Sequence, residues 1–233
     1  MKREIIGENW RFQRERTDVP EGDLWQNSTV GRILTMSPRT SVVAQCIWDT
    51  QWWEKEFSVA LKTTLPAFNV MWDVGAHIGW FTLLLRTNCK RAVCFEPDAE
   101  AVKYLTANIC ANGLDSIIVP NALMRNSDTY FVSGGICFKG TQGKQALSLE
   151  RAIESGEKPD FIKMDIEGGE YELIREMRNL NWWPQWFAVE LHCTLLSVNA
   201  MAELLRILGD VYEVRWHGSH PDGTTDTLIM ERA

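Results

Sequence analysis

The stretch NVMWDVGAHIG, residues 69–79, decides the fold of this chain of 233 residues. It begins as an apolar run interrupted by Asp73, which is typical of a strand buried in a parallel sheet. Gly75 and Gly79 follow, and glycine allows the backbone to turn tightly and to approach a ligand closely. Residues 79–87 continue as a predicted helix whose first N–H groups are free. The order strand, glycine turn, helix predicts a ligand-binding α/β fold.

The remaining pattern is a regular alternation of strands and helices. Further strands are predicted at 91–95, 116–120, 160–165, 186–192, 211–216 and 226–231, and helices at 98–111, 147–155, 168–179 and 198–208. Such alternation predicts a Rossmann-like α/β fold with an open, mostly parallel seven-stranded sheet and helices on both faces. The last two strands are expected to pair at one edge, with an antiparallel edge strand at the C-terminus.

The chain divides into two parts at about residue 65. Residues 1–65 are expected to form an N-terminal extension that packs on the core: 1–40 irregular and polar, 41–47 a strand, and 50–63 a helix. Residues 66–233 form the main domain. Within it, the glycine-rich stretch 121–146 is predicted to be a hairpin or loop.

Bulk properties restrict the class of partner. The formal net charge is −7, and an acidic chain is a poor partner for a polyanion, so no nucleic-acid substrate is expected. The six cysteines form no C-x-x-C pair, which disfavours a zinc or redox motif. The charged N-terminal stretch lacks an apolar leader, and no run of about 18 apolar residues exists, so no membrane span and a cytoplasmic location are expected.

The glycine turn contains the first candidate ligand site: Asp73, Gly75, Ala76 and Gly79. Its spacing D-x-G-x-x-x-G differs from the G-x-G-x-x-G of nicotinamide binders. A carboxylate at Asp73 would repel a pyrophosphate but could attract the ammonium group of S-adenosylmethionine. The competing interpretation is an ordinary joint between strand and helix with an incidental aspartate.

Two further strand ends carry candidate cofactor residues. Glu96 lies at the end of the second strand, about 20 residues after the glycine turn, where an acid can accept both ribose hydroxyls. It could equally be a solvated acid near a helix start. Asn121 and Ala122 follow the third strand and could contact an adenine, although Asn121 also suits a turn.

The fourth and fifth strand ends carry candidate catalytic groups. Asp165 and Glu167 belong to the segment KMDIEGGE, and Glu190 and His192 share one face of a strand. His192, Glu167 and Asp165, in that order, are candidate general bases, and Asp165 is also assigned to the cofactor site. Asp165 with Glu190 could hold a divalent metal, although we make no firm metal assignment. Glu170 is expected only to favour the helix dipole.

Three segments together resemble the FkbM-type family of S-adenosylmethionine-dependent methyltransferases. They are WDVGAHIGWFT (72–82), CFEPDAEAVKYLTANICANGL (94–114) and DFIKMDIEGGEYELI (160–174), and the last is similar to the family signature K-x-D-x-E-G-x-E. The resemblance covers residues 69–192. It implies S-adenosylmethionine as cofactor, and O-methylation of a hydroxyl on a small molecule, glycan or natural product. It also implies a cofactor loop at Asp73, Gly75 and Gly79, a ribose acid at Glu96, and Asp165 and Glu167 near the transferred methyl.

Other functions remain open at this point. An N-methyltransferase acting on an amine would share these motifs. A nicotinamide-dependent oxidoreductase is the rival enzyme, and the missing G-x-G-x-x-G argues against it. A non-catalytic module could use the same fold to bind a cofactor or partner. The acceptor, the metal requirement and the oligomeric state are left open.

Overall fold

A seven-stranded sheet forms the centre of the computed structural model, which describes residues 24–35, 41–125, 129–133, 136–139, 143–154, 158–220 and 223–233. The strand order across the sheet is β13-β14-β12-β11-β3-β4-β5. The strands are β3 (Phe68–Val74), β4 (Cys89–Phe95), β5 (Ser116–Val119), β11 (Phe161–Met164), β12 (Trp186–His192), β13 (Tyr212–Ser219) and β14 (Thr225–Arg232). The predicted Rossmann-like class is thereby confirmed.

The order in which strands are added to the sheet reverses at β3. From β3 the chain adds β4 and β5 on one side, then returns to add β11 and β12 on the other, and these five strands are parallel. The C-terminal strand β14 is antiparallel to β12, as expected, but it lies second from the edge, because β13 pairs with it on the outside. The switch point between β3 and β11 is where such sheets bind ligands.

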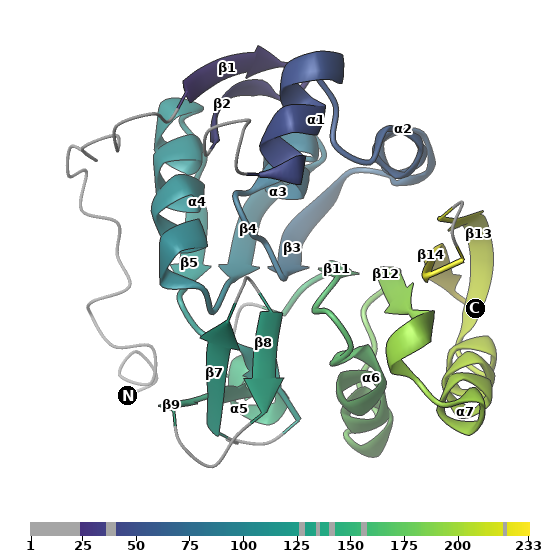
Figure 1. Ribbon diagram of the computed structural model, residues 1–233. Coiled ribbons are helices and arrows are strands. Elements are labelled where there is room, and N and C mark those ends of the chain that lie inside the picture. The colour runs from purple at the N-terminus through teal and green to yellow at the C-terminus, as the bar shows by residue number, and fades with distance from the viewer. Residues whose placement is uncertain are drawn as a thin grey trace.

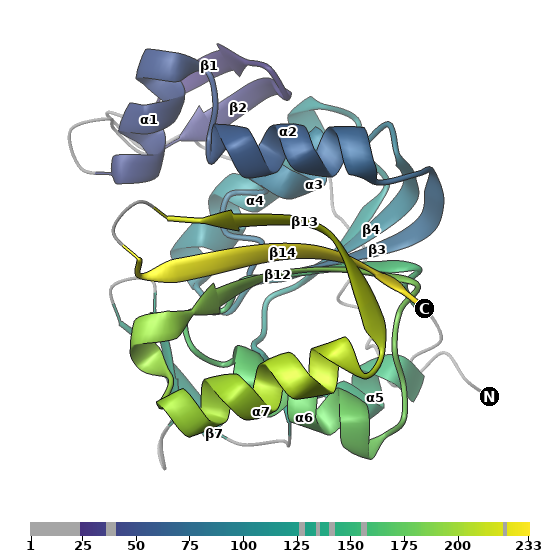
Figure 2. The ribbon, with the colours of Figure 1, turned by 90° about the vertical axis from the view of Figure 1, so that its right-hand side faces the viewer.

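Helices cover both faces of the sheet (Figures 1 and 2). On one face lie α1 (Val42–Thr50), α2 (Lys55–Thr64), α3 (Trp80–Leu84) and α4 (Ala99–Ala111), and on the other α5 (Leu149–Glu154), α6 (Glu170–Asn179) and α7 (Val198–Gly209). Successive strand residues point to opposite faces. Met71 and Phe161 therefore join the core under the first group of helices, whereas Trp72 and Ile162 join the core under the second.

The N-terminal segment differs from its prediction. Residues 41–47 are not a strand, because they belong to α1. Val42 and Val43 suggested a strand, but the Ser41 hydroxyl accepts a hydrogen bond from the Ala44 N–H at 3.2 Å and starts a helix. Ala44 and Ile47, three positions apart, are buried on one helix face. Within the stretch 1–40 predicted to be irregular, β1 (Leu24–Ser28) and β2 (Gly31–Thr35) form a hairpin, and the rest of that prediction lies outside the described residues.

Shorter elements fill the stretch between β5 and α5. β7 (Thr129–Ser133) pairs with β8 (Ile136–Lys139) and β9 (Lys144–Gln145), which confirms the predicted hairpin. β6 (Leu123–Met124) pairs in parallel with β10 (Leu147–Ser148). After β12 a 3₁₀ turn, η2, covers Cys193–Leu195. Among the helices of the described residues, each falls short of the length and apolar character that crossing a membrane requires.

Asn108 joins the hairpin, α4 and the glycine turn. It is 0% exposed, and its side-chain amide donates to the carbonyls of Leu34, at 3.1 Å, and Ile78, at 2.8 Å. Its oxygen accepts from the Leu34 N–H at 2.5 Å. Three backbone groups thus find their partner in one buried side chain, which fixes the hairpin against the core.

Replacing this side chain should therefore unfold the protein more easily. We expect Asn108→Ala to lower the free energy of unfolding by about 2–3 kcal/mol, because it leaves buried backbone groups without partners. Denaturant unfolding measures the change. The exposed Asn179→Ala is the matched control and should change stability by less than ~0.5 kcal/mol. Equal effects of both variants would contradict this role of Asn108.

Candidate active site

A cavity of about 960 Å³ opens at the carboxyl ends of the parallel strands. Its walls come from the glycine turn after β3, the ends of β4, β11 and β12, the segment around Asn121, and the N-terminal segment with Val43, Trp53 and Glu54. This volume lies at the upper end of the range of small-molecule sites, about 300–1,000 Å³. The polar residues predicted at successive strand ends are therefore brought together at one opening.

The glycine turn depends on glycine at two positions. Gly75 has φ +79°, and a Cβ there would collide with the carbonyl oxygen of Asp165. Gly79 has φ +88°, caps α3, and would place a Cβ 2.7 Å from the Leu105 side chain. The N–H groups of Gly75 and Ala76 both donate to the Phe95 carbonyl, at 3.0 and 3.1 Å. Gly75 and Ala76 line the cavity, whereas Gly79 shapes the turn behind it.

Asp73 lies behind the cavity wall rather than on it. Its side chain is 0% exposed and accepts a hydrogen bond from the Thr82 hydroxyl at 2.6 Å. Its other oxygen lies 3.8 Å from the Lys163 ammonium and has no hydrogen-bond partner. Burial raises the pKa of Asp73, and the charge of Lys163 opposes that rise. Asp73 therefore faces Lys163 and is not placed to contact the ammonium group of a ligand.

Lys163 connects three parts of the site and was not singled out in the sequence. Its ammonium donates to the Gly75 carbonyl at 3.2 Å and to Asp165 at 3.1 Å, and it lies 4.7 Å from the centre of the Phe81 ring. Burial lowers its pKa, but the charges of Asp165 and Asp73 outweigh burial and raise it. The available signal was a lysine within a buried apolar strand, where an unpaired charge is too costly to persist.

Glu96 and Asn121 line the cavity on the side of β4 and β5. Glu96 is 6% exposed and accepts from the N–H groups of His77, at 2.7 Å, and Asp98, at 2.9 Å. Burial raises its pKa to about 7, and these two N–H groups limit the rise. The Asn121 amide donates to the Gln145 carbonyl at 3.1 Å, while its buried oxygen has no partner. Asn121 and Ala122 line the cavity, and the unpaired buried oxygen of Asn121 is an acceptor that a ligand donor could satisfy.

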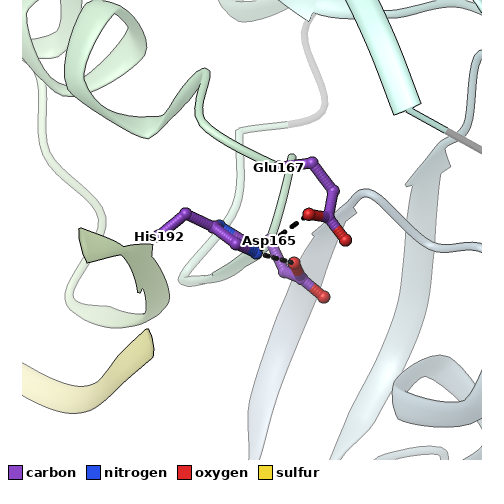
Figure 3. A group of neighbouring side chains, drawn as sticks. All are labelled: Asp165, Glu167 and His192. Atoms are coloured by element: carbon purple, nitrogen blue, oxygen red, sulfur yellow. Dashed lines mark ion pairs between the residues drawn. The ribbon is translucent and has the colours of Figure 1, made fainter. Parts of the chain in front are cut away.

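His192 lies between carboxylates (Figure 3). Its Nδ1 is 2.9 Å from Glu170, and its Nε2 is 3.2 Å from Glu167 and 3.9 Å from Asp165. Carboxylates only accept hydrogen bonds, so both ring nitrogens must carry protons. Burial lowers the pKa of His192, but hydrogen bonds to Glu167 and Glu170 raise it to about 11. His192, the first-ranked candidate base, is therefore a cation in this arrangement.

Glu170 does more than favour the helix dipole. Its side chain is 0% exposed at the start of α6 and accepts from the N–H groups of Ile166, at 3.1 Å, and Gly168, at 3.0 Å. It also holds Nδ1 of His192. Glu167, with φ +55°, lies in the loop that these bonds close. Glu170 thus fixes both the loop carrying Glu167 and the ring that faces it.

Asp165, Glu167 and His192 also form a group that could accept a metal ion. One ligand atom from each lies within 4.8 Å of the others. Glu190, predicted to hold a metal with Asp165, is not part of this group. A metal would require His192 to give up the Nε2 proton that faces Glu167, so the donor set fits poorly as it is arranged. We assign no metal to the site.

Glu54 was missed entirely by the sequence analysis. It lines the cavity together with Glu190, although it lies in the N-terminal segment. Burial raises the pKa of Glu54 to about 8, with further contributions from Glu190 and Asp165. Burial and Asp165 raise the pKa of Glu190 to about 7. The two carboxyl groups are thus close enough to influence each other.

The fold and site together define a class. Rossmann-like methyltransferase domains combine three features that are present here. They have an open sheet with one antiparallel strand next to its edge, a glycine turn after the first strand, and an acidic residue at the end of the second. The chain belongs to one family of that class, because the model of the FkbM methyltransferase domain matches residues 73–210.

Known proteins agree with this placement. Hexuronic acid methyltransferase AglP of Haloferax volcanii is 28% identical over 137 residues, which cover 53% of this chain and 56% of that protein. Trm5b of Pyrococcus abyssi superposes with a TM-score of 0.52 at 14% identity, covering 91% of this chain and 56% of that one. Sp1610 of Streptococcus pneumoniae gives a TM-score of 0.50 at 13% identity, covering 78% and 71%. The chain thus spans about half the length of AglP and Trm5b, and the two structures show the fold alone.

The buried acid Glu54 should make stability depend on pH. Its pKa is raised in the folded state, so the folded protein keeps a proton that the unfolded chain releases above its ordinary pKa of 4.5. Stability should therefore fall as pH rises from about 4.5 through about 8. Over that range we expect the unfolding free energy of Glu54→Gln to fall less than that of the unchanged protein, by on the order of 2 kcal/mol. Denaturant unfolding at several pH values tests this.

Glu56→Gln is the matched control, because Glu56 is an exposed acid in the same helix. Its pH profile should follow that of the unchanged protein. Identical profiles for Glu54→Gln and Glu56→Gln would show that Glu54 is not the buried acid described above.

Proposed function

We propose that the protein is an S-adenosylmethionine-dependent O-methyltransferase that methylates a hydroxyl of a small molecule, glycan or natural product. The observation that carries the proposal is the cavity, where the glycine turn, Glu96 and the unpaired oxygen of Asn121 meet the carboxylates of Asp165 and Glu167. The residues that would hold the methyl donor (Gly75, Ala76, Glu96 and Asn121), called the donor side, and the carboxylates that would act on the acceptor (Asp165 and Glu167), called the reaction side, therefore line the same cavity.

The residues on the donor side fit S-adenosylmethionine. Gly75 and Ala76 bring backbone close to the cavity without side-chain bulk. Glu96 is held by two N–H groups, and its oxygens have capacity left for ribose hydroxyls. The free Asn121 oxygen suits the amino group of an adenine. When bound, S-adenosylmethionine supplies a methyl group that is already activated by a sulfonium.

The reaction side must hold the acceptor and take its proton. Asp165 already bonds Lys163 and faces His192, whereas Glu167 has 50% of its side chain exposed and has His192 as its ion-pair partner. We therefore assign proton acceptance to Glu167, and orientation of the acceptor hydroxyl to Asp165. His192, held by Glu170, keeps Glu167 in place through its charge.

The transfer needs a single proton transfer, from the acceptor hydroxyl to Glu167. The acceptor oxygen bonds to the methyl carbon as the carbon–sulfur bond breaks, the electron pair stays on sulfur, and the hydroxyl proton passes to Glu167. Positioning and exclusion of water then account for much of the rate. AglP is named for hexuronic acid, which supports a glycan-type acceptor for this chain. An amine acceptor remains the alternative, and acceptor profiling separates the two.

Donor binding is the first test. Calorimetric titration should show micromolar binding of S-adenosylmethionine and S-adenosylhomocysteine, and none of NAD. Glu96→Ala and Asn121→Ala should each weaken binding about 10- to 100-fold, the loss expected for one or two hydrogen bonds. Glu100→Ala, an exposed acid on α4, is the control and should bind as the unchanged protein does. Binding of NAD alone would replace the proposal by a nicotinamide enzyme.

Proton acceptance by Glu167 is tested separately. Glu167→Gln should lower kcat about 10²- to 10⁴-fold with donor affinity unchanged, as expected for loss of a general base. Glu172→Gln, another exposed carboxylate of the cavity wall, is the control. Assays with excess chelator belong to the same experiment, and activity abolished by the chelator would move the role to a metal. Unchanged kcat in Glu167→Gln would refute the assignment.

A further inference from the structure

The lining of the cavity is rich in acidic side chains. Among the described residues that line the cavity, the acidic side chains are Glu54, Glu96, Asp98, Asp165, Glu167, Glu172 and Glu190, and the permanently basic ones are Lys163 and Arg125. Both cations are already paired, Lys163 with Asp165 at 3.1 Å and Arg125 with Glu172 at 3.1 Å. No described lining cation is left to receive an anionic group.

Glu54 is held at this wall by a buried network. It has φ +41°, a left-handed conformation that is unfavourable for a non-glycine residue and is often found at functional sites. The Ser58 hydroxyl donates to the carbonyl of the preceding residue, Trp53, at 2.7 Å, and accepts from the Trp80 indole at 2.9 Å. Trp80 begins α3, so the turn with Glu54 is tied to the helix of the glycine turn.

Glu190 reaches the same place from the sheet. On β12, Val189 and Leu191 point into the core under α5–α7, so Glu190 points to the opposite face, which α1 and α2 cover (Figure 2). The Thr225 side chain hydrogen-bonds it from β14. Two carboxyl groups from distant segments thus meet beside Asp165.

We propose that Glu54 and Glu190 form the acceptor subsite and select an uncharged hydroxyl-bearing acceptor, such as a neutral sugar, over one that carries a carboxylate. This inference rests on the proposed function. A hydroxyl both donates and accepts, which matches two carboxyl groups that donate when protonated and accept when ionised. An acceptor carboxylate would lie next to Asp165, and next to Glu54 and Glu190 once they ionise at alkaline pH, and like charges at close range strongly disfavour binding.

The experiment compares matched acceptors. The full chain is assayed with radiolabelled S-adenosylmethionine and the methyl glycosides of glucose, galactose and mannose, each beside its uronic acid. We expect kcat/KM to favour the neutral sugar of at least one pair by ~10-fold or more, since like-charge contacts cost several kcal/mol. At about pH 9, where Glu54 and Glu190 are both ionised, Glu54→Gln and Glu190→Gln should each reduce that preference at least ~5-fold by improving turnover of the uronic acid. Glu56→Gln, exposed on α2, should leave the preference unchanged.

Three outcomes would overturn this inference: preference for the uronic acids, a preference that neither Glu54→Gln nor Glu190→Gln alters, or no transfer to any of the six sugars. Calorimetry with S-adenosylmethionine runs beside the assay on every variant. Normal donor binding with any of these outcomes rejects the acceptor assignment alone, whereas absent donor binding rejects the proposed function itself. The two Gln variants sit on different elements, so misfolding of one leaves the other informative.

Discussion

One buried ammonium group, that of Lys163, is the interaction on which the site depends. In the register of β11 against β3, Lys163 is paired with Asp73, and both side chains leave the sheet on the same face. The ammonium lies between Asp73 and Asp165 and holds the Gly75 carbonyl. Without this charge, Asp73 would be a fully buried carboxylate with no cation beside it, and unpaired buried ions are very costly. Strand register, turn geometry and charge balance are therefore parts of one arrangement.

The sheet and most of the cavity wall could be predicted from the sequence, and the reason is geometric. Buried parallel strands appear as apolar runs, and their carboxyl ends meet at one edge, so Glu96, Asn121 and Asp165 had to approach each other. The direction of Asp73 could not be predicted. It depends on which residue of β11 stands opposite, and sequence alone does not define register between strands that are distant in the chain.

The helix predicted at 50–63 corresponds to α2, but the strand predicted at 41–47 was wrong because the structure there depends on tertiary contacts. The valines at 42 and 43 favour a strand locally, yet capping by Ser41 and burial of Ile47 produce a helix. Glu54 lies in a left-handed turn, which no residue pattern around it indicates. The charge of His192 could not be predicted from the sequence either. It depends on Glu170, whose side chain at the start of α6 lies against the His192 ring.

The family match covers only part of the residues that form the site. The residues that fit a methyl donor, from Gly75 to Asn121, lie within the matched stretch 73–210, and so do Asp165 and Glu167. Glu54 lies outside it, on a segment tied to the core through Ser58 and Trp80. The family match therefore covers the donor side together with Asp165, Glu167 and Glu190, but not Glu54. Differences in acceptor between proteins of this family are expected wherever a cavity residue such as Glu54 comes from a segment outside the family domain.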